Sequence, residues 1–176
     1  MILGAICGDI VGSPYEFSPI KSKEFDFINQ FSEFTDDTVM TVVNMEWLLG
    51  IKEDETEEEC KERLISLMHE IGVKYPNCGY GGHFYGWLIN KKTEPYYSWG
   101  NGSAMRVSPV GWMFDTIEDV LKYSKISAEV THNHPEGIKG AQATAAAIFL
   151  ARNGKTKKEI CDYIIETFDY NFLSKL

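Results

Sequence analysis

Hydrophobic residues recur along most of the chain at every third or fourth position, the spacing of one face of an α-helix. No segment shows the strict alternation of a half-buried β-strand. In the segment 2–11 an apolar face is accompanied by Gly4, Ala5 and Gly8, small residues that would let a neighbouring helix approach closely. We therefore expect an all-α protein whose first helix lies at the centre.

Capping signals place the borders of the later helices. Pro14 ends the first helix and opens a polar surface segment over 18–32, after which the second helix begins near Asp36. Thr56 and Glu59 form a capping box in front of an amphipathic stripe. Further helices are expected over 79–90, 102–114 and 117–129, from Pro135 to the stop at Asn153-Gly154, and after a second capping box at Thr156 and Glu159.

The composition narrows the class of protein. A chain of 176 residues with 44% hydrophobic content is expected to form a single domain, 1–176. A net charge of −9 argues against general nucleic-acid binding, which needs clustered basic residues. The four cysteines are far apart and are expected to be reduced core thiols, and no secretion signal or membrane-spanning run is evident, so we expect a cytoplasmic protein without a membrane partner.

The acidic pair Asp36-Asp37 is the strongest chemical feature of the sequence. With Thr35 before it, the pair offers only oxygen ligands, the set that Mg²⁺, Mn²⁺ or Ca²⁺ prefers. The alternative is an ordinary helix start, because Thr and Asp are favoured as N-caps and acids in the first turn complement the helix dipole. Taken alone, the pair leaves both interpretations open.

Two other segments contain candidate binding residues. Asn101, Gly102 and Ser103 form a glycine-rich turn before an expected helix, which suits either an anion site made of backbone N–H groups or a plain helix entry. His132 and His134 are two residues apart, so they do not share a helical face, and zinc binding is not expected. His134, just before a proline, is a candidate N-cap.

Three further positions have structural interpretations. Arg106 is expected to form a structural ion pair and Met105 to lie in the core. Asp9, in the first helix, is expected to be a buried structural partner, with indirect contact to a metal as the alternative.

Taken together and in order, four segments of this chain resemble the ADP-ribosylglycohydrolase family, which includes the dinitrogenase-reductase-activating glycohydrolases. The resemblance extends from about Leu3 to Ala151. Its motifs are Gly8-Asp9-Ile10-Val11-Gly12-Ser13-Pro14-Tyr15-Glu16, Phe34-Thr35-Asp36-Asp37-Thr38, Gly100-Asn101-Gly102-Ser103-Ala104-Met105-Arg106 and Thr131-His132-Asn133-His134-Pro135. The ordered set is far more specific than any single motif.

The resemblance implies a compact orthogonal helical bundle and a Mg²⁺-dependent hydrolase, with Mn²⁺ as an alternative metal. Such an enzyme would cleave the glycosidic bond between ADP-ribose and a modified protein residue or other acceptor. By resemblance, Glu16 assists the attacking water and Thr35, Asp36 and Asp37 hold the metal, so Glu16, Asp36 and Asp37 are the catalytic candidates. Asn101, Gly102, Ser103 and His132 would bind the substrate. Independently of the resemblance, most of the aromatic residues in the middle third of the chain are expected to lie in the core, and one or two of them could stack on adenine.

This sequence departs from the family pattern in one respect. The family is longer and carries a second acidic motif, Asp-x-Asp-Thr, near its C-terminus, which has no counterpart here. Three hypotheses follow: a hydrolase, active alone or with its site completed by a homo-oligomer or a complementing chain; a catalytically weakened module that binds ADP-ribose or a nucleotide; and a structural protein that uses only the helical scaffold.

Overall fold

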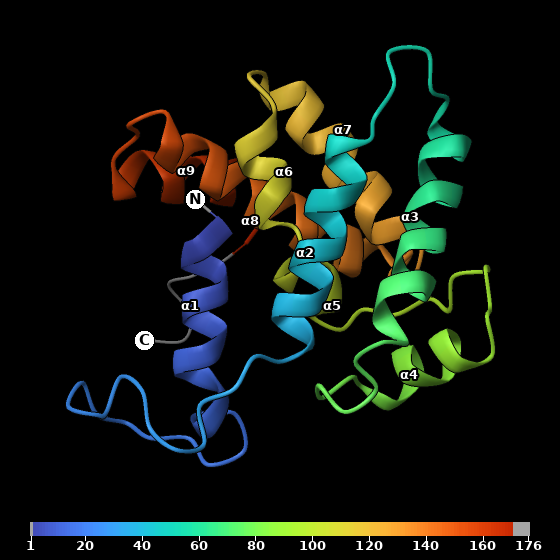
Figure 1. Cartoon of the computed structure of the whole chain (residues 1–176). Coiled ribbons are helices and arrows are strands. Elements are labelled where there is room, and N and C mark those ends of the chain that lie inside the picture. Colours follow the sequence, from blue (N-terminus) through green and yellow to red (C-terminus); the bar gives the residue numbers. More distant parts are fainter. Residues whose placement is uncertain (1, 171–176) are drawn as a thin grey trace.

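The regular secondary structure of the computed structural model, which describes residues 2–170, is entirely helical (Figure 1). This confirms the predicted all-α class. The helices are α1 (Ile2–Gly12), the short 3-10 helix η1 (Ser13–Tyr15), α2 (Asp36–Leu49), α3 (Glu57–Gly72), α4 (Gly82–Ile89), α5 (Gly102–Met105), α6 (Ser108–Met113), α7 (Ile117–Glu129), α8 (Pro135–Arg152) and α9 (Lys157–Phe168).

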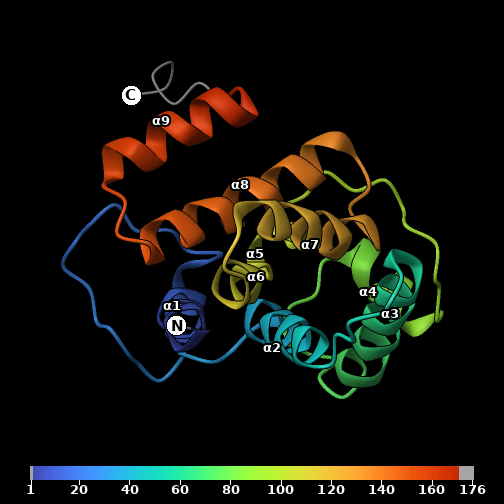
Figure 2. The same ribbon diagram turned by 90° about the horizontal axis from the view of Figure 1, so that it is seen from above.

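Two helices, α2 and α8, organise the core. Helix α8 packs against α5, α6 and α7 on one side and against α9 on the other, and Figure 2 shows α9 on its outer side. Helix α2 packs against α1, α3, α5 and α6. The largest apolar side chains between these layers are fully buried, among them Trp47, Met40, Leu64 and Trp87. Burial of such side chains is the main stabilising contribution to the fold.

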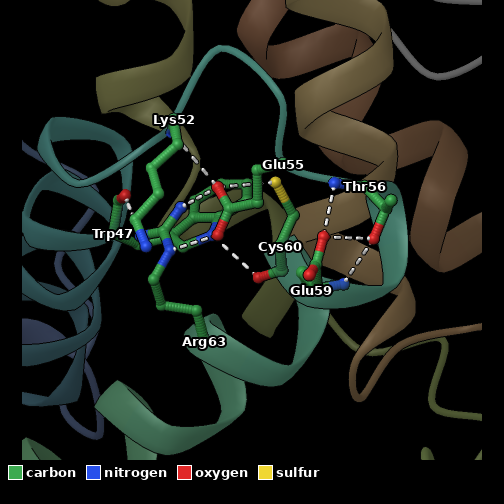
Figure 3. Close-up of polar contacts among 7 residues, drawn as sticks. All are labelled: Trp47, Lys52, Glu55, Thr56, Glu59, Cys60 and Arg63. Atoms are coloured by element: carbon green, nitrogen blue, oxygen red, sulfur yellow. Dashed lines mark hydrogen bonds and ion pairs between the residues drawn. The ribbon is translucent and has the colours of Figure 1, made fainter.

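A polar cluster joins the end of α2 to the start of α3 (Figure 3). The Arg63 guanidinium donates to both carboxylate oxygens of Glu55, at 2.7 and 2.8 Å, and also to the backbone oxygen of Trp47. The Trp47 indole in turn donates to the Cys60 carbonyl at 2.9 Å. Only 6% of the Glu55 side chain is exposed, and its hydrogen bonds from Arg63 lower its pKa to about 2 despite that burial.

The capping signals predict most helix borders correctly. Both capping boxes are present, at Thr56 and Thr156, and the range 117–129 is that of α7. The single helix expected over 102–114 is wrong, because the chain breaks there into α5 and α6. Pro109 lies in the first turn of α6, where its missing N–H would interrupt a longer helix.

The prediction that the first helix is central is also wrong. Helix α1 has no buried residue, and 62% of Leu3 is exposed. Two of the small residues expected to receive a neighbour have none: a Cβ atom added to Gly4 or Gly8 would meet no atom within 4 Å. Helix α1 is therefore anchored mainly through its contacts with α2 and α6.

The cysteines follow the prediction only in part. All four are free, but Cys60 alone is buried and Cys7 is exposed on α1, so the expectation of core thiols is wrong for Cys7. Within residues 2–170, no helix combines the length and apolar character needed to cross a membrane.

Candidate functional site

The acidic pair opens α2, as the sequence predicts. Thr35 is the N-cap, and its hydroxyl accepts a hydrogen bond from the backbone N–H of Asp37 at 3.3 Å. The backbone N–H of Asp36 donates to the carbonyl of Cys78 at 2.7 Å. The N-cap of α2 is thus made by Thr35.

Asp9 ties α1 to this helix start. Its carboxylate accepts hydrogen bonds from the backbone N–H and hydroxyl of Thr35, at 2.8 and 2.6 Å, and from the same two groups of Thr38, at 3.2 and 2.5 Å. Asp9 is therefore the structural partner that was predicted, although it is half-buried. The Thr35 hydroxyl donates to Asp9 and accepts from Asp37, which leaves one lone pair free to accept or to bind a cation.

Four carboxylates, those of Asp9, Glu16, Asp36 and Asp37, lie close enough to interact near the C-terminal end of α1. Burial raises the pKa of Asp36 to about 6, and the negative charges of Asp37, Glu16 and Asp9 add to that rise. Burial also raises the pKa of Asp37, with further contributions from Asp9 and Glu16. The ionised forms of Asp36 and Asp37 are thus disfavoured by their surroundings, and a bound cation would relieve this.

Asp36 and Asp37 each line a different cavity, and the two cavities are neighbours. Asp36 lines one of about 460 Å³, together with Asn101, Gly102 and His132. This volume lies within the range of small-molecule sites. Met105 borders this cavity and also the second one.

The second cavity, of about 490 Å³, is lined by Asp37 together with Glu16, Asp9 and Thr35. Asp36 thus shares the first cavity with the predicted substrate-binding residues Asn101, Gly102 and His132, and Met105 borders both cavities.

A buried hydrogen-bond chain connects Arg106 to His132 through Thr131. Arg106 donates to the hydroxyl of Thr131 at 2.9 Å, and that hydroxyl lies 2.8 Å from Nδ1 of His132. A guanidinium can only donate, so Thr131 accepts from Arg106. We assign the ring hydrogen of His132 to Nε2, the tautomer in which Nδ1 accepts from the Thr131 hydroxyl. Burial and the charge of Arg106 lower the pKa of His132 to about 3, so the ring is neutral.

Nε2 of His132 faces the glycine-rich turn. A Cβ atom added to Gly102 would lie 2.9 Å from it. Position 102 must therefore lack a side chain if the ring is to stay where it is.

Arg106 does not form the predicted ion pair. In the part of the chain that the structure describes, it is buried without an acidic partner, and it donates to the carbonyl of Ser127 at 2.6 Å and to Thr131. Burial lowers its pKa to about 10, which still leaves it charged at neutral pH. Arg106 therefore holds Thr131 and, through it, His132. This role could not be predicted from the sequence, because it depends on residues that are distant from Arg106 along the chain.

Ser103 lies outside the lining of both cavities. Its side chain is buried in α5, and its hydroxyl donates to the carbonyl of Gly137 at 2.7 Å. Substrate contact through this hydroxyl would require that bond to break. Helix α5 has only four residues, so its dipole is a weak source of anion binding.

Two exposed aromatic residues, Tyr97 and Trp99, adjoin a residue that lines the first cavity, and the sequence did not distinguish them from the other aromatic residues of this region. Tyr97 and Trp99 lie on either side of Ser98, which lines the cavity, and their ring centroids are 4.7 and 5.7 Å from that of His134. His134 is the predicted N-cap of α8 and accepts from the backbone N–H of Glu136 at 3.1 Å. The sequence signal that could have indicated this pair is the alternation of aromatic and small residues over 97–100.

Tyr97 has a backbone conformation that is rare for a bulky residue, with φ of 54°. Its N–H is held by the side-chain oxygen of Asn133 at 2.8 Å. Such strain is concentrated at functional sites, because surrounding contacts must maintain it.

A divalent metal fits the acidic pair as a partial ligand set. Among residues 2–170 there is no group of three or more His, Cys, Asp and Glu side chains arranged to hold an ion. Mg²⁺, however, is commonly bound through one or two carboxylates, with water and substrate phosphates completing its shell. Asp36, Asp37 and the free lone pair of Thr35 match that pattern.

Comparison with known proteins decides the family. A sequence model described as ADP-ribosylglycohydrolase matches residues 1–174, which is almost the whole chain. The chain belongs to the ADP-ribosylglycohydrolase family. It is similar to two mammalian proteins named ADP-ribosylhydrolase ARH3, from Mus musculus and from Homo sapiens, each 30% identical over 191 residues that cover 90% of this chain and 50% of the relative. The ARH3 of Gallus gallus is 31% identical over 140 residues, which cover 72% of this chain and 37% of the relative.

This ADP-ribosylglycohydrolase-family chain thus spans about half the length of the curated relatives it matches. The family assignment agrees with the all-helical fold. The roles of the individual site residues remain predictions.

Proposed function

We propose that this protein binds ADP-ribose and hydrolyses the glycosidic bond that joins ADP-ribose to a modified protein residue or another acceptor. One observation carries the proposal: Asp36, Asn101, Gly102 and His132, from three distant parts of the sequence, line a single cavity. The relatives named ADP-ribosylhydrolase support this choice of substrate.

The first cavity supplies the groups that would hold the nucleotide. Asn101 and the backbone of Gly102 would contact the diphosphate and ribose. The neutral His132, with its hydrogen on Nε2, would donate a hydrogen bond to a ribose or phosphate oxygen. Trp99, which is 75% exposed, and Tyr97 offer flat surfaces next to the cavity on which adenine could stack.

The second cavity supplies the carboxylate for the chemical step. Cleavage at the anomeric carbon of ribose develops oxocarbenium character, and a carboxylate beside it can take a proton from the attacking water. Glu16 is exposed and shares its cavity with Asp37, so solvent water reaches it without a conformational change. We assign the role of general base to Glu16.

Thr35, Asp36 and Asp37 would hold Mg²⁺, or Mn²⁺ in its place. When bound, the ion would offset the repulsion between an anionic substrate and four carboxylates and orient oxygen ligands. Asp9 holds Thr35 and thereby positions this ligand set.

A second candidate function is binding of ADP-ribose without hydrolysis, or hydrolysis in a site that another chain completes. The observation that favours it is the span of the match, which covers only half of each mammalian relative, together with the partial ligand set.

Release of ADP-ribose from modified protein, followed by chromatography, separates these functions. We expect release in the presence of Mg²⁺ and a loss of about 100-fold or more for Glu16→Gln, the usual contribution of a general base. The same variant should bind ADP-ribose as the unmodified protein does, because Glu16 is not in the nucleotide cavity. Binding without release would support the second function, and neither binding nor release would reject both.

A further inference from the structure

Tyr96 has a hydroxyl group to which the fold gives no hydrogen-bond partner. The side chain is half-buried in the wall of the first cavity, and its ring centroid lies 6.0 Å from that of His132 and 6.2 Å from that of His83. Within residues 2–170, neither a side chain nor a backbone group forms a hydrogen bond with this hydroxyl. A tyrosine hydroxyl in such surroundings normally has a partner, so this one is available to a ligand in the cavity.

A buried positive charge acts on the same hydroxyl. Among the described residues that line the first cavity, Arg106 is the only lysine or arginine. Its Nη2 donates to Ser127 and Thr131, whereas its Nε is buried without a partner. Burial raises the pKa of Tyr96, and the charge of Arg106 opposes that rise. The phenol of Tyr96 therefore lies within range of the guanidinium charge.

The position of this charge determines how the hydroxyl is oriented. The partly negative oxygen of the phenol turns toward the guanidinium, so the hydrogen turns away from it and toward the cavity. His132 contributes a second donor to the same cavity, the hydrogen assigned to its Nε2, and is connected to Arg106 through Thr131. Two donors with one cation behind them suit an anionic oxygen, because hydrogen bonds to charged groups are stronger than those to neutral groups.

We propose that the hydroxyl of Tyr96 donates a hydrogen bond to a phosphate oxygen of the bound ligand, beside the Nε2–H of His132. The inference rests on the proposed function, since the anionic group of ADP-ribose is its diphosphate. Arg106 favours this group through its charge, without touching it. Asp36 lines the same cavity, so one ligand meets a cationic region and an acidic region within a single site.

Replacement of Tyr96 by phenylalanine tests the contact. Tyr96→Phe removes the hydroxyl and keeps the ring that packs beside His83 and His132. No described residue bonds to the hydroxyl, so the urea unfolding midpoint should stay that of the unmodified protein. The affinity for ADP-ribose in calorimetry should fall at least about tenfold, as expected for the loss of a hydrogen bond to a charged group.

Tyr85→Phe is the matched control. Tyr85 lies on α4 outside the lining of the first cavity, and its hydroxyl also has no partner among the residues that the structure describes. This variant therefore removes the same atom from the same helical region of the protein. Both its unfolding midpoint and its affinity for ADP-ribose should equal those of the unmodified protein.

Phosphorus NMR of the complex locates the contact on the ligand. With ADP-ribose saturated by protein, Tyr96→Phe should shift one of the two phosphorus signals relative to the complex of the unmodified protein. Tyr85→Phe should shift neither signal. A hydroxyl that contacts only the ribose or the adenine would leave both signals in place.

Three results would overturn the inference and leave the proposed function standing. They are an unchanged affinity of Tyr96→Phe for ADP-ribose, a loss of affinity together with a lowered unfolding midpoint, and a loss of affinity with both phosphorus signals unmoved. An unmodified protein that does not bind ADP-ribose would instead reject the proposed function, and this inference with it.

Discussion

Replacement of Asp36 by asparagine is expected to stabilise the metal-free protein at neutral pH. The folded state raises the pKa of Asp36 from 3.8 to about 6, mainly through burial and then through the charge of Asp37. Because the folded pKa is the higher one, the associated stability is fully present below pH 3.8 and is lost as the pH rises through about 6. At pH 7.5 the ionised carboxylate therefore opposes folding.

The size of the effect follows from the difference between the two pKa values. About two pH units correspond to about 3 kcal/mol, and solvent screening of this half-buried group reduces that to about 1–2 kcal/mol. Loss of a first-turn acid at the N-terminus of α2 subtracts about 0.3–1 kcal/mol. The net gain expected for Asp36→Asn is thus about 1 kcal/mol at pH 7.5, with little gain at pH 4.

Urea denaturation at several pH values measures this directly. The control is Asp54→Asn, which removes the same charge from an exposed loop residue and should leave the pH dependence of stability unchanged. Mg²⁺ should raise the unfolding midpoint of the unmodified protein and should raise that of Asp36→Asn less. A destabilised Asp36→Asn at pH 7.5, or a pH dependence identical to that of the unmodified protein, would refute the electrostatic reasoning.

Three other variants test separate parts of the structure. Glu55→Gln should lower the free energy of unfolding in urea by about 3 kcal/mol at pH 7, because the lowered pKa of Glu55 reflects its pairing with Arg63. In the unmodified protein the same stabilisation should disappear as the pH falls from 4.5 toward about 2. A stability that does not change over this acid range would contradict the prediction. Gly102→Ala should weaken ADP-ribose binding at least about tenfold in calorimetry, because its methyl group would lie 2.9 Å from His132, and unchanged affinity would argue against the placement of the nucleotide. Thr131→Val should cost about 1–3 kcal/mol of stability, since it leaves a buried donor unpaired, and nitrogen NMR should show that His132 no longer holds its hydrogen only on Nε2.

Local signals made much of the fold predictable. The capping boxes and Pro135 locate helix starts because they depend on contacts only a few residues apart. The prediction of a central α1 failed because apolar spacing shows which face of a helix could be buried, but not which other elements pack against that face. The break between α5 and α6 followed from Pro109, which a purely periodic interpretation overlooked.

The candidate site shows the same division between local and long-range information. The acidic pair and the glycine-rich turn are each a continuous segment of the sequence, so both could be recognised as candidate binding segments from their residue types. The support that Arg106 gives to His132 through Thr131 joins positions 25 residues apart, and charge alone suggested an ion pair instead. Likewise, the close approach of Ser103 to Gly137 depends on helix packing and has no local signature.

The central claim is that the acidic pair and the glycine-rich turn form one site for ADP-ribose and Mg²⁺. Isothermal titration calorimetry with ADP-ribose, with and without Mg²⁺, tests it most directly. We predict binding that is tighter with Mg²⁺, and a loss of this metal effect in Asp36→Ala and Asp37→Ala. No heat of binding in either condition, or a metal effect that both variants retain, would contradict it.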